Sequence, residues 1–490
     1  MADESAPPID LSELMRRMDD PSVPDAQIAP YLIPVPSPDG GIEPGFQPNP
    51  SRVTGLVTGL EGGLIVQSLN NRERRKRQRA YRDRIAAGWS GPRIVEEGDS
   101  WFQYPLLLED IVDHMMRDHA VLSLSGAGHT LAQMLRQNEI LAAISRERAA
   151  ALMLSAGGND LFENGNIARL IEDVRPGMSA NDLVGARFDA FLSEVIGLYR
   201  GLLQRVHSAF PHVVMLIHGY SAAFSRMDRW VGRPLKEAGV MPVAVQNRVV
   251  EVMLARFNAA QKRLAAEPAF HGKLVHVDLT GLGREPGQWY DEIHMSSSQN
   301  RAAADLFADA LRRHLPAAGG LEAGIAEVPE PAGAPVAAVA AHAAALSALD
   351  EHALLCELQE RLDLIDRDPA TADLPSAPLL SLSTGGLEGG IATTVGPLAR
   401  RLLRRWEREL YDLICGDAAA DAAERTKLRE ALGAGQDALV GAIAAWLVSG
   451  PLGVSALLAG VLAALLVKRV GGSAVEEICT LWGERLNAAG

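Results

Sequence analysis

A serine at position 100 and an aspartate–histidine pair near position 290 have the residue types needed for nucleophilic catalysis. Ser100 ends a GDS turn in the stretch 92–104, which reads PRIVEEGDSWFQY. A serine hydroxyl is a weak nucleophile at neutral pH and needs a base that is itself oriented by a third group. Asp291 and His294 are separated by two residues, so both side chains can project from one loop. His294 could then be the base and Asp291 its orienting partner, if the fold brings this loop to Ser100.

Two further turns could supply donors for the oxyanion that forms when a serine attacks a carbonyl carbon. The stretch 121–134, VLSLSGAGHTLAQM, changes from an apolar run to a glycine-rich turn. The stretch 150–162, AALMLSAGGNDLF, ends in a turn that contains Asn159 and Asp160. Losing one such donor typically costs about 10²–10³ in kcat. Simpler interpretations exist for each motif: Asn159 and Asp160 can form an Asx-turn and helix cap, and His294 can be a surface residue before a capped helix.

Short apolar runs alternate with longer helical patterns between residues 93 and 315. The predicted strands are 93–95, 121–124, 150–154, 213–217 and 274–277, and the predicted helices are 106–117, 130–137, 182–208, 248–265 and 299–314. This alternation predicts an α/β domain whose parallel sheet carries helices on both faces. Sites in such sheets lie at the carboxyl ends of the strands. Ser100, the glycine turn, Asn159 and His218 each follow a predicted strand, so we expect them at one edge.

The order of these motifs, GDS, a glycine turn, GxND and DxxH, resembles that of the SGNH (GDSL) hydrolases, a family of serine esterases and acyl hydrolases. The resemblance covers roughly residues 93–315. It implies a flavodoxin-like three-layer α/β/α domain. It also implies that Ser100 is the nucleophile and that Asp291 and His294 complete the triad. An ester or acyl bond would then be cleaved through a Ser100 acyl-enzyme, which water hydrolyses.

The same resemblance assigns the oxyanion-hole donors. They are the backbone N–H of Ser100, the glycine of the second motif and Asn159. Gly128 is preferred to Gly126 as that glycine, because Thr130 follows it in the G-x-T pattern usual in the family. Asp160 is expected to brace the Asn159 turn or to cap the next helix rather than to perform chemistry.

The sequence departs from the family pattern in both halves of the site. Trp101, Phe102 and Tyr104 follow the GDS motif, where an aliphatic residue is usual, and they are expected to line a pocket or to pack beneath the site. Met295 replaces the usual proline after His294. The triad residues are retained, but the shapes of both loops are expected to differ from the usual ones.

Other histidines are weaker candidates for the site. His129 and His212 could act as bases, but neither lies in a DxxH motif. His218 either belongs to a simple turn or lines the pocket with Trp101. No cysteine, metal-ligand cluster or phosphate-binding glycine loop accompanies these motifs, so neither a metal nor a cofactor is expected.

Charge and cysteine content restrict the partners and the compartment. The chain has 490 residues, a net charge of −14 and a pI near 5.4, so nucleic acid is not an expected partner. A basic run at 71–87 predicts a helix with a solvated face, or alternatively one that contacts an anionic surface. The 3 cysteines argue against a disulfide framework, and the N-terminus lacks a signal peptide pattern. We therefore expect a cytoplasmic protein.

The composition predicts four parts of the chain. They are an N-terminal extension at 1–92, partly irregular with the basic helix, the hydrolase domain at 93–315, an Ala/Pro-rich linker at 316–345 and an all-α domain at 346–490. In the last part, helices are predicted at 346–366 and 397–414. Residues 438–467 contain no charge and are interrupted by Gly450 and Pro451, which predicts a buried helical hairpin. Membrane insertion or assembly through this hairpin is the alternative.

The favoured function is a serine hydrolase acting on a small-molecule ester or acyl substrate. A lipid, an acetylated sugar, a thioester and a small ester are all compatible with the motifs. Two other functions compete with it. One is a binding protein that keeps the fold with little turnover, and the other is an effector whose helical domain mediates membrane or partner association. The sequence leaves the oligomeric state open.

Overall fold

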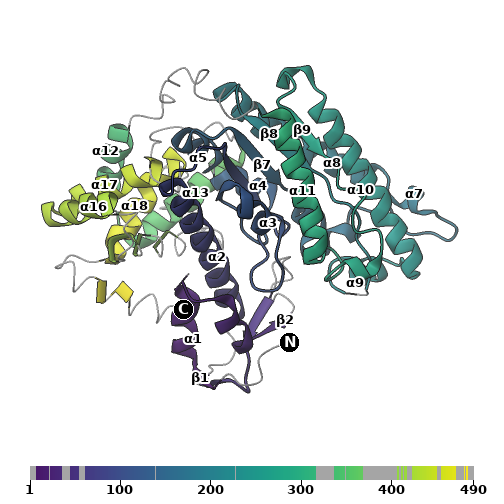
Figure 1. Cartoon of the computed structure of the whole chain (residues 1–490), viewed down its shortest axis with the longest axis horizontal. Helices are drawn as coiled ribbons and strands as arrows, with labels where there is room; N and C mark the ends of the chain where they lie inside the picture. The colour runs from purple at the N-terminus through teal and green to yellow at the C-terminus, as the bar shows by residue number, and fades with distance from the viewer. Residues whose placement is uncertain are drawn as a thin grey trace, which may run out of the picture. The chain divides into compact units, whose positions relative to one another are not determined.

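The computed structural model divides into two compact units (Figure 1). We call Met1–Met134 with Arg148–Ala326 the sheet unit, and Leu135–Glu147 with Glu327–Gly490 the helical unit. The structure describes residues 7–20, 22–35, 45–54, 61–137, 139–226, 228–315, 336–347, 349–367, 406–407, 410–411, 413–415, 422–449, 454–470, 479–480 and 482–483. Each unit is described separately below.

Five parallel strands form the sheet that carries the predicted motifs. They are β5 (Arg93–Gly98), β6 (Ala120–Ser123), β7 (Ala151–Ser155), β8 (Val214–His218) and β9 (Leu274–Val277), in the order β6-β5-β7-β8-β9. Every residue of β6, β7 and β8 is buried, as expected for parallel strands covered on both faces. All five predicted strands are confirmed, and the strand order is that of flavodoxin-like folds.

Helices cover this sheet in the predicted three-layer arrangement. Helix α3 (Ile111–Asp118) packs against α11 (Ser297–His314), and α8 (Ala186–Ala209) packs against α10 (Val243–Ala265). Both α10 and α11 contact β8 and β9 (Figure 1). The other elements of the unit are β1 (Ile9–Asp10), α1 (Leu11–Asp19), η1 (Asp25–Gln27), η2 (Ala29–Tyr31), β2 (Leu32–Val35), β3 (Gly45–Pro48), β4 (Val53–Thr54), α2 (Glu61–Ala86), α4 (Leu131–Gln137), α6 (Gly158–Phe162), η3 (Glu163–Ala168), α7 (Ala180–Leu183), α9 (Gly232–Glu237), η4 (Pro268–Phe270) and η5 (Pro286–Gln288).

Two predicted helices have different bounds in the structure. The helix predicted at 106–117 begins only at Ile111, because Asp110 caps it and Leu106 has a positive φ of 66°. The helix predicted at 182–208 is divided into α7 and α8 by non-helical backbone at Gly185. Both differences fall at helix starts, where capping rather than periodicity decides the boundary.

The basic run lies in helix α2, and its predicted solvated face is confirmed only in part, because Arg79 and Asp83 are exposed whereas the preceding arginines are buried. Arg72, Arg74, Arg75 and Arg77 are between 1% and 7% exposed. Buried charges need partners, and Arg72, Arg74 and Arg77 meet carboxylates or backbone carbonyls. For example, Arg72 binds Asp25, and Arg74 donates to the Leu124 carbonyl. Four of the side chains on which contact with an anionic surface would depend are therefore inside the sheet unit, and that contact stays a prediction.

The apolar C-terminal segment forms the core of the helical unit. Its helices are α5 (Glu139–Glu147), α12 (Val336–Leu346), α13 (Glu351–Arg367), α16 (Ala422–Ala434), α17 (Gln436–Ser449) and α18 (Ala456–Val470). Helix α18 contacts α12, α13 and α17, and residues 456–459 and 461–467 of α18 are buried apolar side chains in this core. The hairpin prediction is thus met on both sides of Gly450 and Pro451, which themselves lie outside the described residues.

Three predictions for the helical region need comment. The linker predicted at 316–345 is partly wrong, because α12 already begins at Val336. Most of the helix predicted at 397–414 lies outside the described residues. Among the residues that the structure describes, no helix is long and apolar enough to cross a membrane. Membrane or partner association through residues 438–467 stays a prediction.

The cysteines give a further correction. Cys415 and Cys479 form a disulfide, although they are 64 residues apart, and Cys356 is free. The small and odd number of cysteines therefore does not support a reducing compartment, since disulfides persist mainly in oxidising ones. Cysteine count carries no information on which pairs are close in space.

Candidate active site

The Ser100 turn lies between the carboxyl ends of two neighbouring strands. Gly98 at the end of β5 is paired with Ser155 at the end of β7. Chain connections leave β5 and β7 in opposite directions across the sheet, so a crevice opens at this point. Asp99 fixes the turn, because its carboxylate accepts hydrogen bonds from the Ser155 hydroxyl at 2.7 Å, from the Trp101 N–H at 3.0 Å and from the Tyr220 hydroxyl.

Ser100, His294 and Asp291 form a continuous hydrogen-bonded line. Ser100 Oγ lies 2.7 Å from His294 Nε2, and His294 Nδ1 lies 2.7 Å from Asp291 Oδ2. With the imidazole proton on Nδ1, facing the carboxylate, Nε2 is free to accept the serine proton. Ser100 and His294 are 3% and 2% exposed. The three residues predicted from sequence are therefore brought together across almost two hundred residues of chain.

The environment of Asp291 keeps its carboxylate ionised. Burial alone would raise its pKa, but the neighbouring His294 and the hydrogen bonds outweigh burial, and the pKa is lowered from its ordinary value. The second carboxylate oxygen accepts the backbone N–H groups of Ile293 at 2.9 Å and His294 at 2.8 Å. An ionised and fixed carboxylate can hold one histidine tautomer and can stabilise an imidazolium.

Glu292, between the two loop residues of the line, was not predicted as part of the site. Its side chain is fully buried and accepts five backbone N–H groups from a single segment of chain, at distances between 2.7 and 3.1 Å. The donors are those of Arg226, Asp228, Trp230, Val231 and Gly232. This carboxylate holds the DxxH loop in place. An acidic residue between Asp291 and His294 was the only sequence signal, and it does not reveal such an arrangement.

The candidate oxyanion donors differ in the hydrogen bonds that their N–H groups already make within the protein. Asn159 lies with Ser100 in the lining of a pocket, and its Nδ2 donates to the His129 carbonyl at 2.7 Å. An amide nitrogen carries two N–H groups, so a second donor remains. The Gly126 N–H already donates to the Gly98 carbonyl at 3.1 Å, which favours Gly128 over Gly126.

Asp160 has the supporting role that was expected of it. Its carboxylate accepts the Leu131 N–H at 3.0 Å, which joins the Asn159 turn to the start of α4. Burial raises the pKa of Asp160 to about 6. Neighbouring Gly157 has a φ of +89°, and a Cβ on Gly158 would lie 2.7 Å from the Tyr220 hydroxyl. Both glycines are therefore required by the shape of this turn.

The pocket beside Ser100 is small and mostly apolar. Its lining residues are Asp99, Ser100, Trp101, Gly158, Asn159, Phe162, Tyr220, Ala222, Ala223 and Ile293. Trp101 is thus a pocket residue, as expected, and its indole N–H donates to the Ile293 carbonyl at 3.0 Å. His218 is not, because it is fully buried and its ring stacks on Trp101 with centroids 5.6 Å apart.

Two other aromatic residues of the GDS region have separate roles. Phe102 packs beneath the site, 5.6 Å from both His218 and Phe307 between ring centroids. Tyr104 contacts the line itself: its hydroxyl donates to Asp291 Oδ2 at 3.3 Å, and its ring lies 4.4 Å from that of His294. The sequence predicted only that these aromatics would line or support the site.

The alternative bases do not reach Ser100 in this arrangement. His129 Nδ1 lies 3.4 Å from the buried carboxylate of Glu97, and His212 is exposed two residues before β8. Within the described ranges, no group of three or more His, Cys, Asp or Glu side chains could hold a metal ion. Among the described histidines, the one with a hydrogen bond to Ser100 is His294.

Comparison with known proteins gives a family match for the sheet unit. The sequence model of the GDSL-like Lipase/Acylhydrolase family matches residues 83–319. Similar solved structures include phospholipase A1 from Streptomyces albidoflavus NA297 (15% identity, TM-score 0.32) and a Clostridium thermocellum family 3 carbohydrate esterase (14%, 0.30). Each alignment covers 46% of this chain and 99% of the other. No match was found among curated proteins.

The match to the GDSL-like lipase/acylhydrolase family covers nearly half of the chain, including the Ser100 turn and the DxxH loop. The protein is accordingly a serine ester hydrolase.

Proposed function

We propose that the protein cleaves an ester or acyl bond of a small molecule through a Ser100 acyl-enzyme. The observation that carries the proposal is the line of two 2.7 Å contacts from Ser100 Oγ through His294 to Asp291. His294 Nε2 takes the hydroxyl proton while Ser100 Oγ attacks the carbonyl carbon. His294 then gives this proton to the leaving group. Asp291 stabilises the imidazolium during both steps.

The second half of the reaction uses the same residues. His294 takes a proton from water as the water oxygen attacks the acyl carbon, and it then gives this proton to Ser100 Oγ as the bond between the acyl carbon and Oγ breaks and the acid is released. Both tetrahedral intermediates carry an oxyanion. We assign its donors to the Ser100 N–H, the Gly128 N–H and the free N–H of Asn159 Nδ2, which together supply fixed dipoles in a buried site.

Fluorophosphonate labelling tests this proposal, because the reagent reacts with activated serines and requires no knowledge of the substrate. The wild-type protein is expected to be labelled at Ser100. Ser100→Ala is expected to remove labelling, and His294→Ala to slow it by roughly 10³-fold or more. Ser221→Ala is the matched control. That hydroxyl adjoins the pocket residues but faces Met295, so labelling should persist.

Two results would contradict the proposal. One is the absence of labelling in a well-folded wild-type protein, which would favour a binding function with little turnover. The other is labelling that survives in Ser100→Ala, which would place the reactive nucleophile elsewhere.

A further inference from the structure

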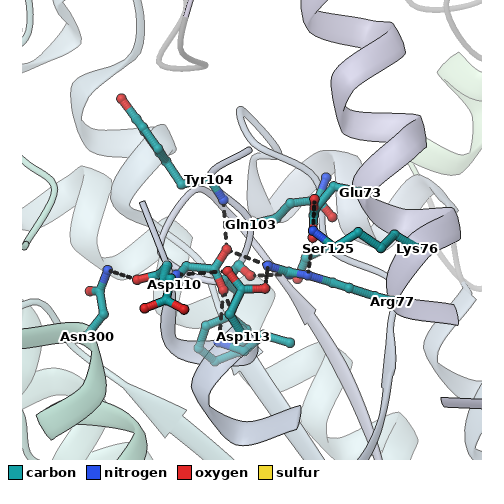
Figure 2. A network of polar contacts seen from close by, with 12 residues as sticks. Glu73, Lys76, Arg77, Gln103, Tyr104, Asp110, Asp113, Ser125 and Asn300 are labelled. Carbon is teal, nitrogen blue, oxygen red and sulfur yellow. Dashed lines mark hydrogen bonds and ion pairs between the residues drawn. The ribbon is translucent and has the colours of Figure 1, made fainter. Parts of the chain in front are cut away.

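The buried guanidinium of Arg77 lies at the centre of a polar network next to the proposed site (Figure 2). Arg77 belongs to α2, outside the segment that matches the family, and is 2% exposed. Its Nη1 donates to the Phe102 carbonyl at 2.6 Å, and its Nη2 to Asp110 at 2.5 Å and Asp113 at 2.9 Å. Its Nε donates to Glu73 at 3.2 Å. Each of the three guanidinium nitrogens therefore has a partner.

The charge of Arg77 is permanent. Burial alone would lower its pKa, but the carboxylates of Asp110, Asp113 and Glu73 outweigh burial and raise the pKa well above its ordinary value. A planar guanidinium presents its donors in a fixed fork, so it fixes the relative positions of its acceptors. A lysine would keep the charge and lose this geometry.

The network fixes the main chain directly after the nucleophile. Arg77 holds the Phe102 carbonyl, and Asp110 Oδ2 accepts the Tyr104 N–H at 2.9 Å as well as the Arg77 bond. In Figure 2 the Tyr104 main chain faces Asp110 while its ring points away from the network. That ring ends in the hydroxyl that donates to Asp291 Oδ2.

The same network also reaches the helix that follows the DxxH loop. Asn300, in the first turn of α11, donates to the Glu109 carbonyl at 3.0 Å, and Glu109 adjoins Asp110 (Figure 2). The Glu109 N–H is in turn bonded to Ser297 Oγ at 3.1 Å. The two chain segments that carry Ser100 and His294 are therefore joined below the site as well as in it.

We propose that Arg77 is a positioning residue, which holds Tyr104 so that its hydroxyl and ring keep Asp291 and His294 aligned with Ser100. The inference rests on the proposed function, because it concerns the efficiency of that triad. Neither Arg77 nor Tyr104 lines the pocket. Their loss should therefore lower kcat and leave KM for a small ester nearly unchanged.

The test compares Arg77→Lys, Tyr104→Phe and the double variant with p-nitrophenyl acetate as substrate. Rates are expressed per active site, and the active sites are counted by fluorophosphonate labelling. Misfolded molecules are therefore not included in the calculated kcat. A hydrogen bond to a charged group corresponds to about tenfold in rate, so each single variant should lose about tenfold in kcat. If Arg77 acts through Tyr104, the double variant should also lose only about tenfold, whereas independent effects would multiply to about 100-fold.

Arg84→Lys is the matched control on the same helix. The Arg84 guanidinium donates to the carbonyls of Arg117 and His119, at the end of α3 away from the Arg77 network. The substitution therefore weakens contacts between α2 and the α3 region but removes no hydrogen bond that leads to Asp291. Its kcat should stay within twofold of wild type. An equal loss in this control, or a wild-type kcat in Tyr104→Phe or Arg77→Lys, would overturn the inference.

Multiplicative losses in the double variant would also overturn it, as would a KM that rises with the loss of kcat. These outcomes are distinct from failure of the proposed function, which would appear as a wild-type protein that fluorophosphonate does not label. If Arg77→Lys yields no folded protein, Tyr104→Phe decides the matter, since it keeps the N–H bonded to Asp110.

Discussion

Two buried arginines occur in the same sequence context but in different units of the molecule. Arg77 pairs with Glu73 in α2 of the sheet unit, and Arg361 pairs with Glu357 in α13 of the helical unit. Both pairs have the i,i+4 spacing of a surface salt bridge. All four side chains are nevertheless no more than 5% exposed. The spacing alone therefore predicts neither burial nor partners.

The partners beyond the pair differ. Arg77 meets two further carboxylates and the carbonyl of Phe102, which lies in the proposed site. Arg361 instead meets the Leu457 carbonyl of α18 and the His342 ring of α12. Burial lowers the pKa of Arg361 and its single carboxylate does not restore it, whereas the pKa of Arg77 is raised. The first arginine supports a reactive loop, and the second joins helices.

The largest effect is expected from a change in the Asp291–His294 pair, which Arg77 contacts indirectly through Asp110 and Tyr104. Asp291→Asn should lower kcat by roughly 10³–10⁴, because the amide cannot hold the same histidine tautomer or stabilise the imidazolium. Hydrolysis of p-nitrophenyl acetate per folded molecule measures the loss. Asp113→Asn, which removes a carboxylate at the outer side of the Arg77 network, is the control and should cost at most about tenfold. A loss below tenfold in Asp291→Asn would show that Asp291 is not part of a working triad.

Much of the sheet unit was predictable, because its signals are local. Apolar runs marked the strands, glycine and Asx patterns marked the turns, and parallel strands place their carboxyl ends at one edge. These rules bring Ser100 and Asn159 to one edge, whereas His294, which does not directly follow a predicted strand, was placed there only by the family resemblance. The same rules do not predict the hydrogen bond from the Tyr104 hydroxyl to Asp291, or the five N–H groups that bind Glu292. Each of these contacts joins segments that are far apart in the sequence.

The basic helix shows why the remaining part could not be predicted. Charged residues are seldom buried unless paired, so a run of arginines favours a solvated face. In α2 the buried Arg72 and Arg74 bind Asp25 and the Leu124 carbonyl, which lie tens of residues away in the sequence. The Cys415–Cys479 disulfide was missed for the same reason. No local sequence pattern predicts these contacts between residues that are far apart in the sequence.

The second prediction concerns the helical-unit pair. Arg361→Leu should lower the free energy of unfolding by about 3–5 kcal/mol, because the fully buried Glu357 loses its charge partner. The double variant Arg361→Leu, Glu357→Leu should recover most of this loss, since two apolar side chains need no partner in that core. Scanning calorimetry measures both.

Ester hydrolysis separates this pair from the Arg77 network. All contacts described for Arg361 are with residues of the helical unit, so kcat per active site should stay at the wild-type value in the double variant. A fall in kcat comparable to that of Arg77→Lys would break the distinction between the two arginines. A double variant as unstable as the single one would show that the ion pair itself stabilises the unit.

The smallest effect is expected from the buried carboxyl that lies nearest to the Arg77 network on the sheet. Burial raises the pKa of Glu96 to about 7, although the charge of Arg77 opposes this shift. The folded state therefore holds a proton that the unfolded state has lost between pH 4.5 and 7. This contribution to stability is complete below pH 4.5 and disappears as the pH rises through 7. Glu96→Gln cannot ionise, so it should gain about 2–3 kcal/mol relative to wild type between pH 5 and pH 8.

Urea unfolding of both proteins at several pH values between 5 and 8 measures this difference. Glu97 has a pKa raised to about 8 by burial, and its charge also raises the pKa of Glu96, so the difference between the two proteins reports Glu96 together with its interaction with Glu97. Glu109→Gln is the control, because that carboxylate is 59% exposed and should leave the pH dependence unchanged. Parallel curves for wild type and Glu96→Gln would mean that Glu96 is ionised in the folded protein. Arg77 would then stabilise a fourth buried carboxylate as well as Glu73, Asp110 and Asp113, and its contrast with Arg361 would be larger still.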